Sequence, residues 1–186
     1  MGFFVFGTTL SGSHTKDMQR KPHSYEVTPT NAELGILNTF APMKEKELAE
    51  IVVNHMMEHD KFSQWLGIEC KVIEAGKSVL QMTIRDEMIN GFGIVHGGIA
   101  FSFADSALAF ASNAYGRLSV ALECSISFPA PVHVGDVLTA TAEQISLTNK
   151  IGVYNIIITN QKNTKVAFFK GTVYRTSKEY FPEHKT

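Results

Sequence analysis

Hydrophobic side chains recur along this chain in two different patterns. From Ile99 to Ala111 they leave almost no polar face, which predicts a helix that is buried on most sides. Residues 78–85 instead alternate apolar and polar positions, as expected for a strand, which should pair as a hairpin with a first strand over residues 68–73 that ends at Gly76. The same alternation predicts a strand over residues 118–128, and three further strand-like runs follow the Gly135-Asp136 turn, over residues 137–147, 151–160 and 165–176. One helix within a run of antiparallel strands indicates an α+β fold.

The remaining segments indicate one domain with a tail at each end. The first 42 residues mix Gly, Ser, Thr, Pro and Asn without a sustained period, so we predict a poorly ordered N-terminal arm over residues 1–42. Helical spacing of apolar residues predicts an amphipathic helix over residues 44–62. We therefore expect one domain over residues 43–178 and a C-terminal tail over residues 179–186. The strand over residues 118–128 should be half-buried.

The charge balance excludes several kinds of partner. A net charge of -1 and a pI near 6.7 provide no electrostatic attraction for nucleic acid. No basic block points to a membrane surface, and the apolar region around the predicted helix carries Asp105 and His96, which argue against lipid. Cys70 and Cys124 belong to no Cys-x-x-Cys pair, so we expect buried, reduced thiols in a cytoplasmic protein.

Candidate chemistry concentrates in residues 90–113. Closely spaced glycines predict a tight loop that delivers His96 to the start of the helix. The first amides of a helix lack internal partners and lie at its positive end. Those of Gly97 and Gly98 are therefore candidates to bind an anion or a polarised carbonyl oxygen, as in an oxyanion hole.

Asp105 is an acid among apolar helix residues, and its position needs a reason. It follows Gly98 by two turns, or about 10 Å at ~1.5 Å per residue, which is too far for both to act on one small group. We therefore hypothesise that two antiparallel helices from two copies build a composite site. His96 and Gly97 come from one copy and Asp105 from the other. The alternative is a buried structural acid that caps a neighbouring loop.

These residues form a recognisable motif, Asn90-x-x-Gly93-x-x-His96-Gly97-Gly98 followed by Phe103-Ala104-Asp105. The motif resembles that of the hotdog-fold thioesterases of the phenylacetic-acid-degradation (PaaI) type, and the resemblance extends from about Phe62 to Thr176. It implies a hotdog fold, in which an antiparallel sheet wraps a long central helix, and homodimers that join into homotetramers. It also implies a cytoplasmic acyl-coenzyme A (acyl-CoA) thioesterase without metal or redox cofactor.

The resemblance implies roles for the motif residues and leaves alternatives open. Asp105 either deprotonates the attacking water or attacks the thioester itself. His96 either shapes the turn or acts at the thioester, and Asn90 either lies beside the acyl group, orients the water or is an ordinary turn residue. Family members often hold this water with a Ser or Thr on the strand after the helix, where this chain has Ala121. That departure keeps a non-catalytic acyl-CoA-binding module as an alternative.

The substrate is less well defined than the family. The resemblance favours an aryl or arylacetyl group, and a medium-chain acyl group fits nearly as well. Coenzyme A carries phosphates, for which Lys150 is the first candidate and Arg117 another, although each is more often simple surface charge. The glycines of residues 91–96 lack the third glycine of a dinucleotide-binding motif, so no such cofactor is expected.

One further motif lies in the predicted N-terminal helix. Residues 55–59, HMMEH, match the His-x-x-Glu-His pattern of some zinc enzymes, and histidines four apart share a helix face. His55 and His59 also fall on the same stripe as Leu48 and Val52. We therefore expect both histidines to pack against the domain and to bind no metal.

Overall fold

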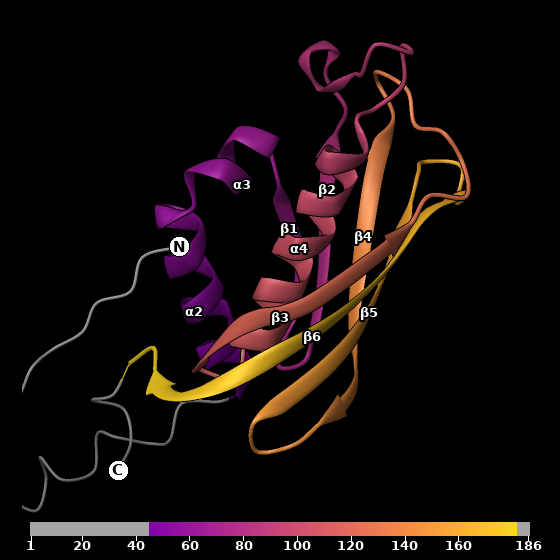
Figure 1. Ribbon diagram of the computed structural model, residues 1–186. Helices are drawn as coiled ribbons and strands as arrows, with labels where there is room; N and C mark the ends of the chain where they lie inside the picture. Colours follow the sequence, from indigo (N-terminus) through magenta and orange to yellow (C-terminus); the bar gives the residue numbers. More distant parts are fainter. Residues whose placement is uncertain (1–44, 182–186) are drawn as a thin grey trace, which may run out of the picture. The chain divides into compact units, whose positions relative to one another are not determined.

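The computed structural model describes residues 45–181, which form three α-helices and one antiparallel sheet (Figure 1). The arm predicted over residues 1–42, and residues 182–186 of the predicted tail, lie outside the described residues. The elements in chain order are α2 (Glu45–His59), α3 (Lys61–Leu66), β1 (Glu69–Glu74), β2 (Lys77–Thr83), the 3-10 turn η1 (Asp86–Met88), α4 (Gly97–Asn113), β3 (Arg117–Ser127), β4 (Val137–Leu147), β5 (Ile151–Thr159) and β6 (Lys165–Glu179).

The sheet and the central helix form the two layers predicted from the sequence. All six strands pair antiparallel, in the order β1-β2-β4-β5-β6-β3. Figure 1 shows α4 against one face of this sheet, and the helix contacts every strand of it. The α+β prediction and its six strands are confirmed, with the long helix and antiparallel sheet that the hotdog resemblance implies.

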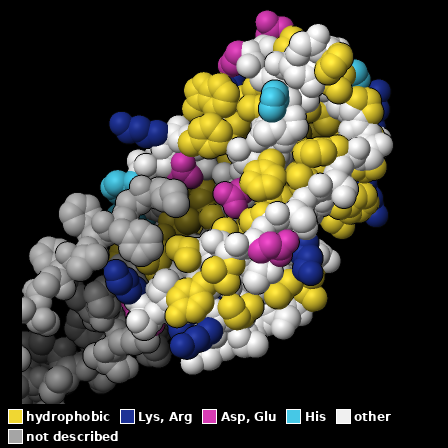
Figure 2. Space-filling view, viewed as in Figure 1, with side chains coloured by type: hydrophobic (Ala, Val, Ile, Leu, Met, Phe, Trp, Pro, Cys, Tyr) yellow, Lys and Arg dark blue, Asp and Glu magenta, His cyan; other side chains and the backbone are white. Residues whose placement is uncertain are grey.

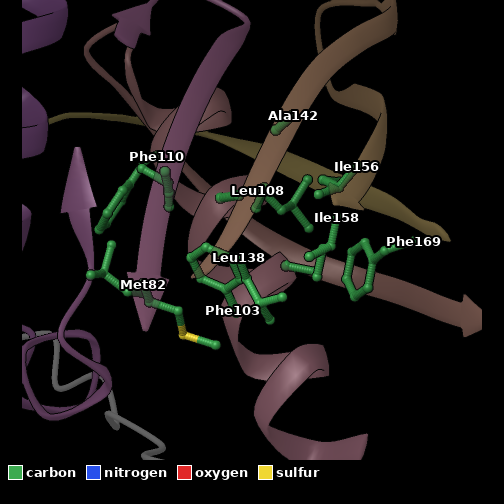
Figure 3. Close-up of a cluster of buried hydrophobic side chains, with 14 of the residues drawn as sticks. Met82, Phe103, Leu108, Phe110, Leu138, Ala142, Ile156, Ile158 and Phe169 are labelled. Atoms are coloured by element: carbon green, nitrogen blue, oxygen red, sulfur yellow. The ribbon is translucent and has the colours of Figure 1, made fainter. Parts of the chain in front are cut away.

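The hydrophobic core lies between α4 and the sheet. The buried cluster includes Phe103, Leu108, Phe110, Leu138, Ile158 and Phe169 (Figure 3). Gly171 of β6 lets the helix approach closely, because a Cβ added there would overlap the Leu108 side chain. The helix is therefore fixed against the sheet, and the groups that it carries have fixed positions.

The helix predicted over residues 44–62 is two helices. α2 ends at His59, and Asp60 begins α3 as its N-cap. Asp60 Oδ1 accepts hydrogen bonds from the Phe62 amide at 3.1 Å and the Ser63 amide at 3.0 Å. The single-helix prediction is wrong because the Asp60 side chain satisfies amides that a continuous helix would bond to the preceding turn.

α2 packs through a stripe formed by Ala49, Val52, Val53, Met56 and Met57. His55 and His59 are both exposed; the prediction that they pack against the domain is wrong for His59, while the His55 ring contacts Tyr180 and Phe181 after β6. The stripe repeats every three to four residues, and both histidines fall beside it.

β3 is an edge strand and is less buried than predicted. Within the described residues it pairs with β6 alone. Val120 and Leu122 are 46% and 58% exposed, so this part of the apolar face predicted for the strand is uncovered in a single chain, while Cys124 and Ile126 pack against the core. The pairing with β6 also shifts between Ala121 and Glu123, and such a bulge is not visible in the alternation of residue types.

The two cysteines differ in burial. Cys70 is exposed and Cys124 is half-buried, and both are free thiols. The prediction of two buried thiols is therefore wrong, because Cys70 lies on β1, at the opposite edge of the sheet from β3. None of the helices within residues 45–181 is long and apolar enough to cross a membrane.

Candidate active site

The loop between η1 and α4 sets the position of His96. Asn90 Oδ1 accepts a hydrogen bond from the Phe92 amide at 2.8 Å, which makes Asn90 a turn-forming residue. The His96 amide donates to the Met88 carbonyl oxygen at 2.9 Å. Side chain and backbone therefore combine to bring His96 to the start of the helix, as the sequence predicts.

Within residues 45–181, the first turn of α4 leaves one amide without an acceptor. His96 is the N-cap, and its Nδ1 accepts a hydrogen bond from the Gly98 amide at 2.9 Å. The Ile99 amide donates to the His96 carbonyl oxygen. Among residues 45–181, no group accepts a hydrogen bond from the Gly97 amide. Gly98 is thus engaged within the chain, while Gly97 offers a donor at the positive end of the helix.

The same hydrogen bond defines the tautomer of His96. Because Nδ1 accepts from Gly98, the neutral ring carries its proton on Nε2. The Nε2–H group is therefore a donor, and His96 is an exposed side chain at the helix start. The imidazole can therefore donate a hydrogen bond to a carbonyl oxygen placed beside it.

Two hollows lie on either side of the helix start. The first has a volume of about 390 Å³, and the residues that line it include Asn90, Gly97 and Phe128. The second also has a volume of about 390 Å³. It is lined by His96 and Gly98, by Phe62 and Trp65 of α3, by Ile99 and Ser102 of α4, and by residues 87–89. Figure 2 shows apolar side chains gathered over the face on which α4 and β3 lie. Four of the predicted site residues therefore lie at one end of the central helix, with Asn90 and Gly97 in one hollow and His96 and Gly98 in the other.

Asp105 lies outside both hollows. It follows Gly97 by eight residues, which is about 12 Å of helix at ~1.5 Å per residue. The side chain is half-buried. Burial raises the pKa of the Asp105 carboxyl above its usual value, and the negative charge of Asp60 raises it further. Within one chain, Asp105 and the Gly97 amide do not face a common small group.

The strand beside Asp105 presents Cys124. Burial, followed by the negative charges of Asp105 and Glu123, raises the pKa of the Cys124 thiol to about 11. The thiol is therefore protonated at neutral pH. Ala121, which stands at the position expected for a hydroxyl, is exposed and borders the bulge in β3. The alternation of residue types puts Cys124 on the apolar face of the strand, but its closeness to Asp105 depends on how the strand crosses the helix, which the sequence does not show.

A buried hydroxyl pair joins α3 to the central helix. Ser63 Oγ donates to Asp60 Oδ2 at 2.6 Å, and Ser106 Oγ lies 2.9 Å from Ser63 Oγ. Because the Ser63 proton is directed at Asp60, Ser106 donates to Ser63. This network holds the negative charge of Asp60 near Asp105. The sequence analysis missed it, although an Asp three residues before a Ser is the spacing of a helix cap.

Lys150 and Arg117 lie at the other end of the domain. Arg117 follows the C-terminal end of α4, whose 17 residues span about 25 Å. Its side chain donates to Asn149 Oδ1 at 3.0 Å and to the Arg175 carbonyl oxygen at 3.2 Å. Lys150, beside Asn149, is exposed. Within one chain these residues do not join His96 and Gly97.

Comparison with known proteins identifies the family. A model of the Thioesterase superfamily matches residues 92–167. The acyl-coenzyme A thioesterase PaaI of Escherichia coli is 42% identical over 120 residues, which cover 64% of this chain and 86% of that protein. The chain belongs to the thioesterase superfamily. The solved structure of E. coli PaaI, from the phenylacetic acid degradation operon, resembles this thioesterase with a TM-score of 0.72 and 38% identity, over 73% of this chain and 99% of that one.

Two other proteins extend the comparison. A putative esterase of Archaeoglobus fulgidus is 34% identical over 139 residues, covering 75% of this chain and 90% of its own. The smu.793 protein of Streptococcus mutans, solved with bound acetyl CoA, has a TM-score of 0.59 and 25% identity over 60% of this thioesterase and 90% of that chain. The predicted hotdog fold and PaaI-like family are thus confirmed. The roles assigned to Asp105, His96, Gly97 and Asn90 stay predictions.

Proposed function

We propose that this protein is an acyl-CoA thioesterase that hydrolyses its substrate to a free acid and coenzyme A. The observation that carries the proposal is the amide of Gly97, the first residue of α4 after the His96 cap, which has no acceptor in the described chain. In the reaction, water adds to the carbonyl carbon, the C–S bond breaks, and the departing sulfur takes up a proton. Negative charge develops on the carbonyl oxygen, and Gly97 supplies a donor where that charge appears.

Asp105 provides the base that activates water, or the nucleophile that attacks the thioester. Burial raises its pKa, which makes its carboxylate a stronger base than an exposed one. The helix separates it from the Gly97 amide of the same chain by about 12 Å. We therefore infer that each site combines His96 and Gly97 of one subunit with Asp105 of the partner subunit.

The uncovered edge of the sheet supports this assembly. β3 ends the sheet, and Val120 and Leu122 are about half exposed on it. A second copy paired along this edge would cover apolar surface and satisfy open backbone groups. We propose a homodimer built in this way, joined into a homotetramer. Both free thiols persist in a reducing cytoplasm, where we place the protein.

The aromatic wall of the second hollow supports an aryl or arylacetyl substrate. Phe62 and Trp65 stack with ring centroids 5.7 Å apart, and they are 51% and 46% exposed. The Arg85 guanidinium lies over the Trp65 ring, 5.2 Å from its centroid, and restrains it further. Exposed, prearranged rings bind another aromatic ring with little loss of side-chain entropy. A phenylacetyl group fits this chemistry better than a flexible alkyl chain, and it accords with the operon of the E. coli relative.

The coenzyme A portion has candidate partners at the far end of the helix. Antiparallel packing of two central helices brings the C-terminal end of one beside the N-terminal end of the other. Lys150 and Arg117 of the partner subunit then lie at the same end of the helix pair as His96 and Gly97. Their positive charges suit the phosphates of coenzyme A.

A second candidate function is a non-catalytic acyl-CoA-binding module. The observation that favours it is Ala121, which offers no hydroxyl to hold a water molecule. The two functions differ in whether bound acyl-CoA is consumed.

One experiment separates them. Thiol release is measured with phenylacetyl-, hydroxybenzoyl- and hexanoyl-CoA, using the parent protein and Asp105→Asn, and acyl-CoA binding is measured by calorimetry. Thioesterase function predicts turnover by the parent, fastest with phenylacetyl-CoA, and a fall of at least about a hundredfold, or ~2.7 kcal/mol of barrier, in the variant. Binding without thiol release in the parent would support the binding module, and equal rates in both proteins would remove Asp105 from the mechanism.

A further inference from the structure

The last turn of α2 carries three side chains with metal-binding atoms. His55, Glu58 and His59 are all exposed, and one ligand atom from each lies within 4.8 Å of the others. Their spacing of three and four residues places them on one face of the helix. The two imidazole rings have centroids 4.6 Å apart. The motif that the sequence analysis expected to pack inward is therefore turned outward, with its ligands converging.

The orientation of His59 suits a metal ligand. His59 Nδ1 lies 2.9 Å from the His55 carbonyl oxygen. A carbonyl oxygen only accepts hydrogen bonds, so Nδ1 carries the proton and donates it. The lone pair of Nε2 is then available to a metal ion. Histidine ligands in metal sites are commonly held in this way, by a hydrogen bond from the second ring nitrogen.

His55 is restrained by aromatic neighbours that follow β6. Its ring centroid lies 5.7 Å from that of Phe181 and 6.4 Å from that of Tyr180, both in edge-on arrangements. These contacts reduce the rotational freedom that a free surface histidine would lose on binding an ion. The negative end of the α2 dipole adds favourable electrostatics for a cation.

We propose that His55, Glu58 and His59 form a surface site for a divalent transition-metal ion. Two imidazole nitrogens and one carboxylate oxygen suit Zn²⁺ or Cu²⁺ and are a poor set for Mg²⁺ or Ca²⁺, which prefer oxygen ligands. Water completes the coordination, since all three side chains face solvent. The bound ion ties the last turn of α2 together and is separate from the proposed thioesterase chemistry.

The test uses the full chain without an affinity tag, because a histidine tag would itself bind zinc. Zn²⁺ is titrated in competition with a chromophoric chelator, and Co²⁺ is used as a spectroscopic substitute. We expect one ion per chain with a dissociation constant in the micromolar range, and a cobalt spectrum without a thiolate charge-transfer band. The Tm should rise with added Zn²⁺, because the ion binds the folded helix.

Variants locate the site. His55→Gln and His59→Gln should each weaken binding by at least about a hundredfold, equivalent to ~2.8 kcal/mol at 1.4 kcal/mol per factor of ten. Both positions are exposed, so the folded state should persist, as circular dichroism can verify. His133→Gln and Cys70→Ser alter another exposed histidine and an exposed thiol, and they should bind Zn²⁺ like the parent. Binding that survives in both α2 variants, that disappears in either control, or that is absent from the parent would overturn the proposal.

Discussion

Replacement of Gly97 by proline isolates the contribution of a single amide proton. Gly97 is the first residue of α4, a position where proline is favoured because its missing N–H would lack an intrahelical partner in any case. The preceding His96 has φ -66° and ψ 131°, which is the extended conformation that a residue before proline requires. The added ring faces Phe128, whose Cζ would lie 3.3 Å from a new Cβ and whose side chain is half exposed. The variant should therefore fold like the parent.

The size of the effect follows from the hydrogen bonds of the first turn. Gly98 and Ile99 already donate to His96, so Gly97 is the remaining donor of the first three residues. Loss of one oxyanion donor typically lowers kcat about 10²–10³-fold, or ~2.7–4 kcal/mol. The free energy of unfolding should be unchanged or higher by up to about 1 kcal/mol, because proline restricts the unfolded chain. A large loss of rate without a loss of stability is the expected signature.

The assay measures kcat and KM for phenylacetyl-CoA by thiol release, with urea unfolding in parallel. Gly97→Ala is the matched control, since it adds the same Cβ beside Phe128 but retains the amide proton. We expect the alanine variant to stay close to the parent and the proline variant to lose kcat more than KM changes. If Gly97→Pro turns over at the parental rate, this amide does not stabilise the reacting carbonyl.

Three further predictions concern the surroundings of the site and the core. Asp60→Asn keeps an acceptor for the cap of α3 but removes the charge that raises the Asp105 pKa. The acidic limb of the kcat/KM profile should therefore move to lower pH, and an unmoved limb would argue against Asp105 as the titrating base. Gly171→Ala should lower the unfolding free energy in urea by about 1–3 kcal/mol, because the new methyl group overlaps Leu108; unchanged stability would mean that the helix has room to move. Tyr154→Phe should leave stability unchanged or raise it by up to about 1 kcal/mol in thermal unfolding, since the buried Tyr154 hydroxyl has no hydrogen-bond partner within residues 45–181. A clear loss would indicate a partner such as a buried water.

The sheet and the central helix could be predicted because their signals are periodic. Alternation across β2 and β4 and the continuous apolar run of α4 follow directly from which face of each element is buried. The break at Asp60 was missed, since it depends on one side chain competing for two backbone amides. The exposure of Val120 and Leu122 was missed because a sequence pattern indicates an apolar face but does not say whether the same chain or another copy covers it.

The positions of the candidate site residues could be predicted, but the hydrogen bonds between them could not. The sequence places His96 at the helix start and Asp105 two turns beyond, which fixes their separation along the axis. It does not reveal that His96 accepts the Gly98 amide proton, while the Gly97 amide has no acceptor among the residues that the structure describes. Such a choice depends on a side-chain rotamer, and residue spacing carries no information about it. The link from Ser63 to Ser106 is likewise a tertiary contact between distant segments.

The composite site is tested most directly by mixing two inactive variants. Asp105→Asn retains Gly97, and Gly97→Pro retains Asp105, so a heterodimer of the two contains one intact site and one doubly altered site. Each variant is measured alone and after joint refolding at equal concentrations, with native mass spectrometry to count heterodimers. Random pairing predicts that thiol release from phenylacetyl-CoA recovers to about a quarter of the parental rate. If heterodimers form and the mixture stays as inactive as the separate variants, Gly97 and Asp105 do not act together across two subunits.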